Sequence, residues 1–154
     1  MAGLILRHCD VGGHTLETDN TWWSESYRRH FALPTFIFAG EALSASHYTT
    51  VPALADAQGY QPVIKVDVHE QPYALPVASS VDRLFEAYSY YLEALLALPR
   101  ARDEGEALLL FPQDVPHIIG RDAQLVTALR AGHFDRLMPG SDEQTWARMV
   151  IDGR

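Results

Sequence analysis

The sequence predicts an α+β protein: a mostly antiparallel sheet with one long packed helix, about 80–98, and a small C-terminal helical extension. Two observations predict this class. Up to about residue 75 the chain is rich in Thr, Val, Ile, Tyr and Phe between turn-forming residues, a composition typical of strands. From residue 79 onward, apolar side chains recur at helical spacing.

The first predicted elements are a hairpin and a short helix. Segments 3–9 and 14–18 flank Gly12-Gly13, and glycine readily adopts the positive φ of a tight hairpin turn. Next, Asp19-Asn20-Thr21 is a candidate cap for a helix that ends near His30, although the same residues also suit an irregular segment.

Three further strands are predicted in the first half of the chain. Segment 35–39 is a short apolar run bounded by a proline and a glycine, a pattern that favours a buried strand. Segment 47–51 is predicted to pair with it. Segment 61–70 is rich in β-branched residues and gives the strongest strand prediction.

The long helix has the clearest boundaries. Ser79 is predicted to cap its first turn, with Asp82 three residues later, and Pro99 ends the run. We expect its apolar stripe to pack on the sheet. The stripe comprises Val81, Leu84, Phe85, Tyr88, Leu92, Leu95 and Leu96.

The C-terminal part is predicted to be mainly helical after one possible strand at 107–111. Asp122 is a candidate cap for a helix through Leu129, which Gly132 terminates. Ser141 and Gln144 form a capping-box pattern before a last helix that reaches Val150.

The length of 154 residues predicts one domain, 1–154, with the sheet and main helix in 1–99 and the C-terminal strand and helical extension in 107–154. A chain of this size buries roughly two thirds of its unfolded surface, so no disulfide or structural metal is required. No apolar run reaches the roughly 18–20 residues that span a bilayer, and Cys9 is the only cysteine. We therefore expect a cytoplasmic protein without a membrane partner.

The charge balance argues against nucleic acid as a partner. The chain has 12 Lys plus Arg against 20 Asp plus Glu, a formal net charge of -8, and its basic residues are scattered. Binding to phosphates requires clustered cations. An acidic surface instead favours a basic protein partner, although many cytoplasmic proteins are acidic without such a role.

The best candidate for a metal or ligand site is Asp67, His69 and Glu70. Asp67 and His69 point to one face of the predicted strand, two residues apart. Two ligands do not make a zinc site, and no second His or Cys cluster has matching spacing. A small metal-dependent enzyme or ligand-binding domain therefore remains the alternative function, and an exposed polar strand end is the structural interpretation.

No catalytic residue or cofactor is assigned. The Gly-x-Ser-x-Gly frame around a nucleophilic serine is absent, and so are the glycine-rich loops that bind phosphates. On the long helix, Glu86 and Glu93 are predicted to lie on nearly the same polar face, and Tyr90 beside them is a candidate anchor for a protein partner. A solvated face and a half-packed tyrosine explain the same pattern.

Several of these segments together resemble the SUKH superfamily. The resemblance rests on the strand Pro62–Asp67, a short polar hairpin, and Val77-Ala78-Ser79-Ser80 opening a helix with a Phe and Leu stripe; segment 36–42 is similar to the preceding strand of that family. It covers roughly residues 33–98. The opening helix and Leu-Pro segment of the family are not found, and the helical tail after Phe111 is additional.

The resemblance implies a central antiparallel sheet flanked by helices and a bacterial immunity protein that neutralises a cognate toxin, often a nuclease, by direct occlusion. It carries no catalytic residues over. The oligomeric state stays open, since the adjacent Trp22 and Trp23 also suit a contact between copies. The candidate partner-binding residues are Asp67, His69, Glu70, Glu86, Tyr90 and Glu93.

Overall fold

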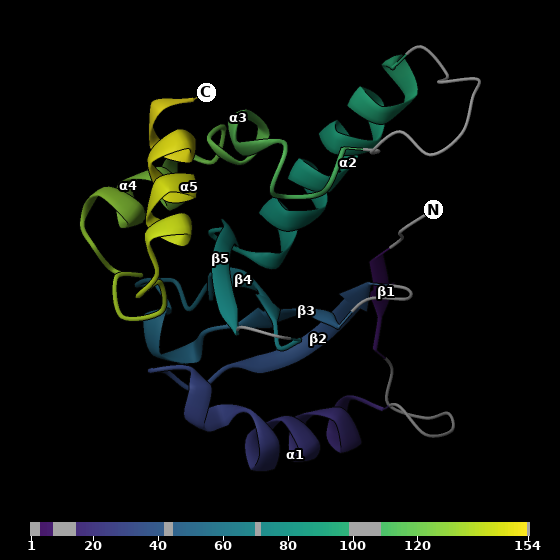
Figure 1. The fold of residues 1–154 in the computed structure, drawn as a ribbon, viewed down its shortest axis with the longest axis vertical. Helices are drawn as coiled ribbons and strands as arrows, with labels where there is room; N and C mark the ends of the chain where they lie inside the picture. The colour runs from purple at the N-terminus through teal and green to yellow at the C-terminus, as the bar shows by residue number, and fades with distance from the viewer. Residues whose placement is uncertain (1–3, 8–14, 42–44, 70–71, 99–108, 154) are drawn as a thin grey trace.

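A five-stranded antiparallel sheet lies at the centre of the protein (Figure 1). The computed structural model describes residues 4–7, 15–41, 45–69, 72–98 and 109–153. The strands are hydrogen-bonded in the order of the chain, so each neighbour is also the next strand along the sequence. The predicted α+β class is confirmed. The strands are β1 (Leu4–Leu6), β2 (Phe36–Glu41), β3 (Ser46–Thr50), β4 (Val63–Asp67) and β5 (Tyr73–Ala78).

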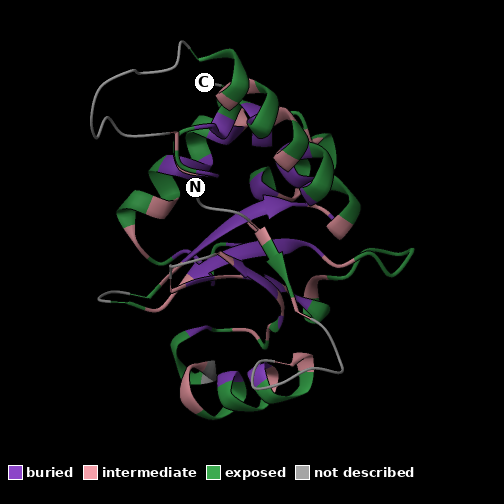
Figure 2. Cartoon of the chain, turned by 90° about the vertical axis from the view of Figure 1, so that its right-hand side faces the viewer, coloured by how far each residue is buried: buried purple, intermediate pink, exposed green. Residues whose placement is uncertain are grey.

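Helices cover both faces of this sheet. One face carries α1, and the other carries α2 and the C-terminal helices (Figures 1 and 2). Because both faces are covered, β4 and β5 are buried along nearly their whole length and have almost continuous apolar sequences. The α-helices are α1 (Leu16–Ser26), α2 (Val81–Ala97), α3 (Pro116–Ile119), α4 (Ala123–Arg130) and α5 (Ser141–Asp152), with short 3-10 turns at Arg28–His30 and Pro52–Leu54.

The strand predictions at 35–39, 47–51 and 61–70 are confirmed as β2, β3 and β4. The predicted pairing of the first two is also confirmed, since Ile37 lies opposite Thr49. Strand β5, which contains Pro76, was not predicted. Proline has no amide proton for a ladder, and it is tolerated here because β5 is an edge strand of the sheet.

The predicted strand at 14–18 is wrong, because its described part begins α1. The Oγ of Thr15 accepts a hydrogen bond from the amide of Thr18 at 3.2 Å, and the Thr18 hydroxyl accepts one from the Thr15 amide at 2.9 Å. This reciprocal capping box starts the helix earlier than the predicted Asp19 cap. The predicted turn at Gly12-Gly13 lies outside the described residues.

Helix α2 is confirmed, but its cap lies one residue later than predicted. The hydroxyl of Ser80, not that of Ser79, accepts a hydrogen bond from the backbone amide of Arg83 at 3.2 Å. Ser79 instead donates its amide and its hydroxyl to the carboxylate of Asp122, at 2.7 and 3.0 Å. Asp122 also caps α4 by accepting the amide of Leu125, so one carboxylate joins the start of α2 to the start of α4.

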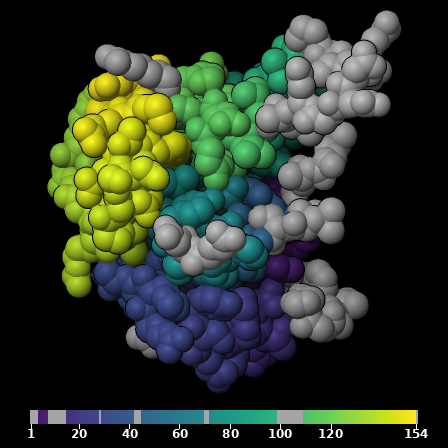
Figure 3. All heavy atoms as spheres, in the orientation of Figure 1, coloured from purple at the N-terminus to yellow at the C-terminus, as the bar shows by residue number. Residues whose placement is uncertain are grey.

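The C-terminal predictions are partly correct. Helices α4 and α5 are present, but Gly140 is the cap of α5 and Ser141 is its first residue, without a side-chain cap. Residues 109–111 of the predicted strand 107–111 do not join the sheet, and the amide of Leu110 bonds to the Asp114 carboxylate at 2.8 Å. The C-terminal helices lie on the same side of the sheet as α2 and form part of the molecular surface there (Figure 3).

An aromatic stack holds α1 to the sheet. The Trp23 ring stacks on Tyr27 and Phe31, with centroids 5.4 and 5.5 Å away, and its Nε1 donates to the Thr35 hydroxyl at 2.8 Å. Adjacent residues on a helix point in different directions. Trp22 is accordingly 42% exposed, whereas Trp23 is 2% exposed.

His47 of β3 lies in the same interface, with the rings of Trp22 and Trp23 6.0 and 5.7 Å from its own. Its Nδ1 is buried without a hydrogen-bond partner among the described residues. Burial lowers the pKa of His47 below 6.5, and the nearby Arg7 lowers it further, against the opposing effects of Asp19 and Asp67. The folded protein therefore disfavours the imidazolium.

We expect the free energy of unfolding to fall as the pH drops below about 6.5, because the unfolded chain protonates His47 before the folded protein does. Urea denaturation between pH 5 and 7.5 measures this dependence, and the His47→Gln variant should show a flatter one. The matched control is His117→Gln, which changes an exposed histidine of α3. Equal pH dependence in wild type and His47→Gln would contradict the prediction.

Candidate functional site

A row of polar side chains crosses the sheet on the face covered by α2. Gly40 of β2 pairs with His47, which places Glu41 beside Ser46 on the opposite face. Ser46 pairs with Asp67, and Asp67 pairs with Tyr73. Four strands therefore each contribute one polar side chain to the row, and the Ser46 hydroxyl donates to the Asp67 carboxylate at 2.8 Å.

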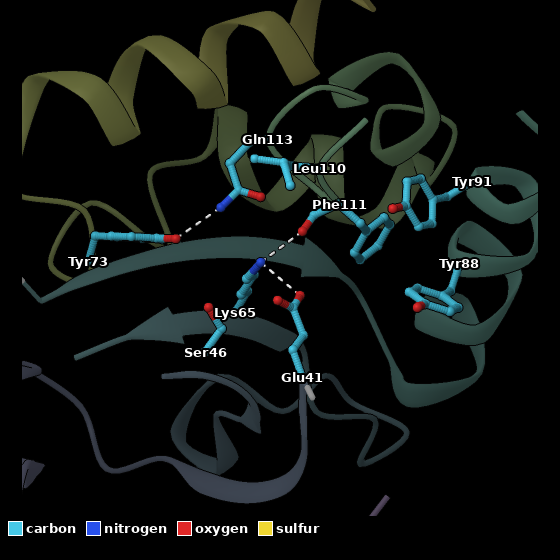
Figure 4. Close-up of a pocket in the computed structure, with 9 residues that line it drawn as sticks. All are labelled: Glu41, Ser46, Lys65, Tyr73, Tyr88, Tyr91, Leu110, Phe111 and Gln113. Atoms are coloured by element: carbon cyan, nitrogen blue, oxygen red, sulfur yellow. Dashed lines mark hydrogen bonds and ion pairs between the residues drawn. The ribbon is translucent and has the colours of Figure 1, made fainter. Parts of the chain in front are cut away.

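Lys65 lies next to this row, on the same face of β4. Its Nζ forms an ion pair with Oε1 of Glu41 at 2.8 Å and donates to the carbonyl oxygen of Phe111 at 2.8 Å (Figure 4). The Tyr48 hydroxyl donates to the same Glu41 oxygen at 2.7 Å. Lys65 is 4% exposed, so its charge is compensated almost entirely inside the protein.

Residues 109–113 cover this site on the side opposite the sheet. The carbonyl oxygen of Phe111 accepts a hydrogen bond from the Lys65 ammonium, and the Tyr91 hydroxyl of α2 donates one to the carbonyl oxygen of Leu109 at 2.8 Å. Gln113 donates its side-chain amide to the Tyr73 hydroxyl at 2.9 Å. These three bonds fix residues 109–113 above the polar row, and they connect the sheet, α2 and the C-terminal part of the chain.

Burial raises the pKa of the tyrosines around the site. The pKa of Tyr48 lies far above its usual value of 10, because of burial and the adjacent Glu41 carboxylate. The pKa values of Tyr73, Tyr88 and Tyr91 are also raised, mainly by burial. At neutral pH these hydroxyls keep their protons, so they act as hydrogen-bonding groups and not as bases.

A cavity of about 200 Å³ opens between these groups (Figure 4). Its walls combine a charged pair, hydroxyls and an amide with aromatic rings. The Oε1 of Gln113 is buried and has no hydrogen-bond partner among the described residues. The cavity is lined by Glu41, Ser46, Lys65, Tyr73, Tyr88, Tyr91, Leu110, Phe111 and Gln113.

Lys65 and Glu41 are not among the residues predicted to form a site. One signal was present: Lys65 is the only lysine, and it interrupts the apolar run of a central strand. A charge at such a position requires a partner inside the protein. The partner was not identifiable from the sequence, because Glu41 lies 24 positions away and meets Lys65 only through the register of β2, β3 and β4.

The predicted ligand set Asp67, His69 and Glu70 is only partly described. Asp67 accepts hydrogen bonds from the Ser46 hydroxyl and from the backbone amide of His69, at 2.8 and 2.9 Å. His69 is exposed, and Glu70 lies outside the described residues. Within the described ranges, no group of three His, Cys, Asp or Glu side chains is placed to hold a metal ion. The metal-dependent alternative remains a prediction, which metal analysis of untagged protein tests.

The other predicted partner residues lie on α2. Glu86 and Glu93 are exposed, and Glu86 pairs with Arg83 one turn earlier. Tyr90 is half-buried, with the Arg121 guanidinium 4.6 Å from its ring centroid. No hydrogen bond or ion pair among the described residues joins this group to Asp67 or His69.

The predicted apolar stripe of α2 does not all face the sheet. Leu84 and Tyr91 are buried, but Phe85, Leu92 and Leu96 are exposed, the last to 86%. At about 100° per residue, the three exposed side chains lie within about 40° of one another around the helix. They form an apolar ridge, here called the α2 ridge, and Glu86 and Glu93 lie along its side facing away from the sheet.

Comparison with known proteins gives no match: no protein-family model, no curated protein and no solved structure is similar to this chain. The resemblance to the SUKH superfamily therefore stays a prediction. Among the described helices, none combines the length and apolar character needed to cross a bilayer.

Proposed function

We propose that this protein acts by binding another protein, as a bacterial immunity protein that occludes the active site of a cognate toxin. The observation that carries the proposal is the α2 ridge, formed by Phe85, Leu92 and Leu96. Single exposed apolar residues are common, but several aligned along one side of a helix favour a protein-binding surface. The resemblance of residues 33–98 to immunity proteins supports the same class of function.

The charges around the ridge favour a basic partner. Glu86 and Glu93 flank the ridge, and the chain carries a formal net charge of -8. A negative surface attracts a positively charged protein and accelerates its association at low salt. Nucleases that act on phosphate backbones are basic, so a nuclease toxin fits both the apolar ridge and its acidic border.

The experiment is co-expression with the product of the adjacent gene, followed by pull-down and a test of protection from its toxicity. We expect a stable complex and protection. The variant Leu92→Glu/Leu96→Glu should weaken binding by about 30-fold or more, because truncating a central interface residue costs about 2 kcal/mol or more and a new charge adds a desolvation cost. Calorimetric titration of the purified proteins measures this change.

The matched control is Met149→Glu, which places a charge on an exposed apolar residue of α5. It should bind like wild type. Both variants alter exposed positions, so their unfolding curves should remain close to that of wild type. Equal binding by both variants would place the interface away from the α2 ridge, and the absence of both complex and protection would refute the immunity function.

A further inference from the structure

The cavity between β3, β4 and the segment 109–113 contains unused hydrogen-bonding capacity. The Gln113 Oε1 is buried without a partner among the described residues. The contacts of Glu41 with Tyr48 and Lys65 both fall on its Oε1, so its Oε2 is a further acceptor at the cavity. Of the three protons of the Lys65 ammonium, two are bonded there. Buried polar atoms in native proteins are rarely left unpaired, so the Gln113 Oε1 is expected to meet water or a bound molecule.

The charges decide what kind of molecule fits. Glu41 and Lys65 neutralise each other across 2.8 Å, so the cavity offers no uncompensated charge to a phosphate or a metal ion. The groups it offers a ligand are the Gln113 Oε1, the Glu41 Oε2 and one proton of the Lys65 ammonium. A hydroxyl group both donates and accepts, and several adjacent hydroxyls satisfy all three groups at once.

The size and the lining of the cavity also fit a small compound with several hydroxyl groups. A volume of about 200 Å³ equals the liquid volume of about six or seven water molecules. The ring of Phe111 packs against both Tyr88 and Tyr91, with centroids 5.2 and 5.3 Å away, and these three rings form one apolar wall. A cyclic polyol has this combination of polar hydroxyl edges and apolar C–H faces.

We propose that this cavity binds a small neutral polyhydroxyl compound, a monosaccharide or a cyclic polyol. Its hydroxyls donate to Glu41 Oε2 and to Gln113 Oε1, and one of them accepts the remaining proton of Lys65. The ligand binds between the sheet and residues 109–113, and it does not require the α2 ridge. This site is therefore independent of the proposed protein-binding function.

Lys65 provides a specific probe, since it is the only lysine in the chain. Labelling with ¹³C-lysine gives one Cε signal from inside the cavity, and this signal is followed while glucose, galactose or myo-inositol is added to the untagged protein. We expect a saturable shift with at least one of them. Gln113→Met should weaken binding about 3- to 10-fold, the effect of losing one hydrogen bond.

A second variant blocks the cavity without disturbing the core. Leu110 lines the cavity and is 57% exposed, so Leu110→Trp should fold and abolish the shift. Gln58→Met, which alters an exposed glutamine elsewhere, should bind like wild type. No saturable shift with any of the three compounds, a shift that Leu110→Trp leaves intact, or saturation by inorganic phosphate instead would each overturn the proposal.

Discussion

Replacing Lys65 by methionine is expected to lower the free energy of unfolding by about 3–5 kcal/mol, the usual cost of removing one partner of a buried ion pair. Methionine fills a similar space, so the loss is electrostatic. The side chains of Lys65 and Glu41 are only 5% and 15% exposed, and the carboxylate that remains has little access to water. The carbonyl of Phe111 also loses its donor. Urea denaturation with linear extrapolation measures the change.

The control is the double variant Glu41→Gln/Lys65→Met. A neutral amide still accepts the hydrogen bond from Tyr48 and leaves no buried charge, so the double variant should be more stable than Lys65→Met alone. Such a recovery identifies the unpaired carboxylate as the cause. A Lys65→Met variant within about 1 kcal/mol of wild type would show that water solvates the pair, because exposed ion pairs contribute that little.

Replacing Trp23 by alanine is the second substitution with a large expected effect, about 3–5 kcal/mol less stable than wild type. The indole is 2% exposed, stacks on Tyr27 and Phe31, and donates to the Thr35 hydroxyl. Alanine leaves a cavity between α1 and the sheet and removes the donor. Thermal and urea unfolding at neutral pH measure the loss.

Its matched control is Trp22→Ala, one residue earlier in the same helix. Trp22 is 42% exposed and lies at the edge of the same aromatic group, so its removal should cost clearly less. Similar losses for the two tryptophans would contradict the view that Trp23 is the central contact of α1. A small loss for both would indicate that α1 contributes little to global stability.

Strands β2, β3 and β4 and helices α2, α4 and α5 follow from local patterns. A β-branched run between turn formers and an apolar repeat between a cap and a proline are properties of neighbouring residues. Errors arose where local patterns are ambiguous. Threonine at 15 and 18 favours a strand by composition, but the two side chains cap a helix together. Pro76 concealed β5, because proline is acceptable only at a sheet edge and the sequence does not tell which strand is the edge.

Local sequence patterns also do not determine which face of α2 is buried. The apolar repeat predicts a helix but does not decide which apolar residues meet the sheet, because the stripe is wider than one contact surface. Leu84 and Tyr91 are buried, whereas Phe85 and Leu92 are exposed. The direction in which α2 crosses β5 determines this division, and that direction depends in part on contacts with α3, which is distant in sequence.

The sequence by itself determined the α+β class, the positions of most strands and helices, and the acidic character, because these depend on composition and on residues within one turn or one strand. The tertiary structure alone decided that Glu41, Lys65 and Gln113 share one cavity and that an apolar ridge of α2 stays exposed. Both features require strand register and helix orientation. Those depend on which long-range contacts bury the most apolar surface while pairing every buried charge.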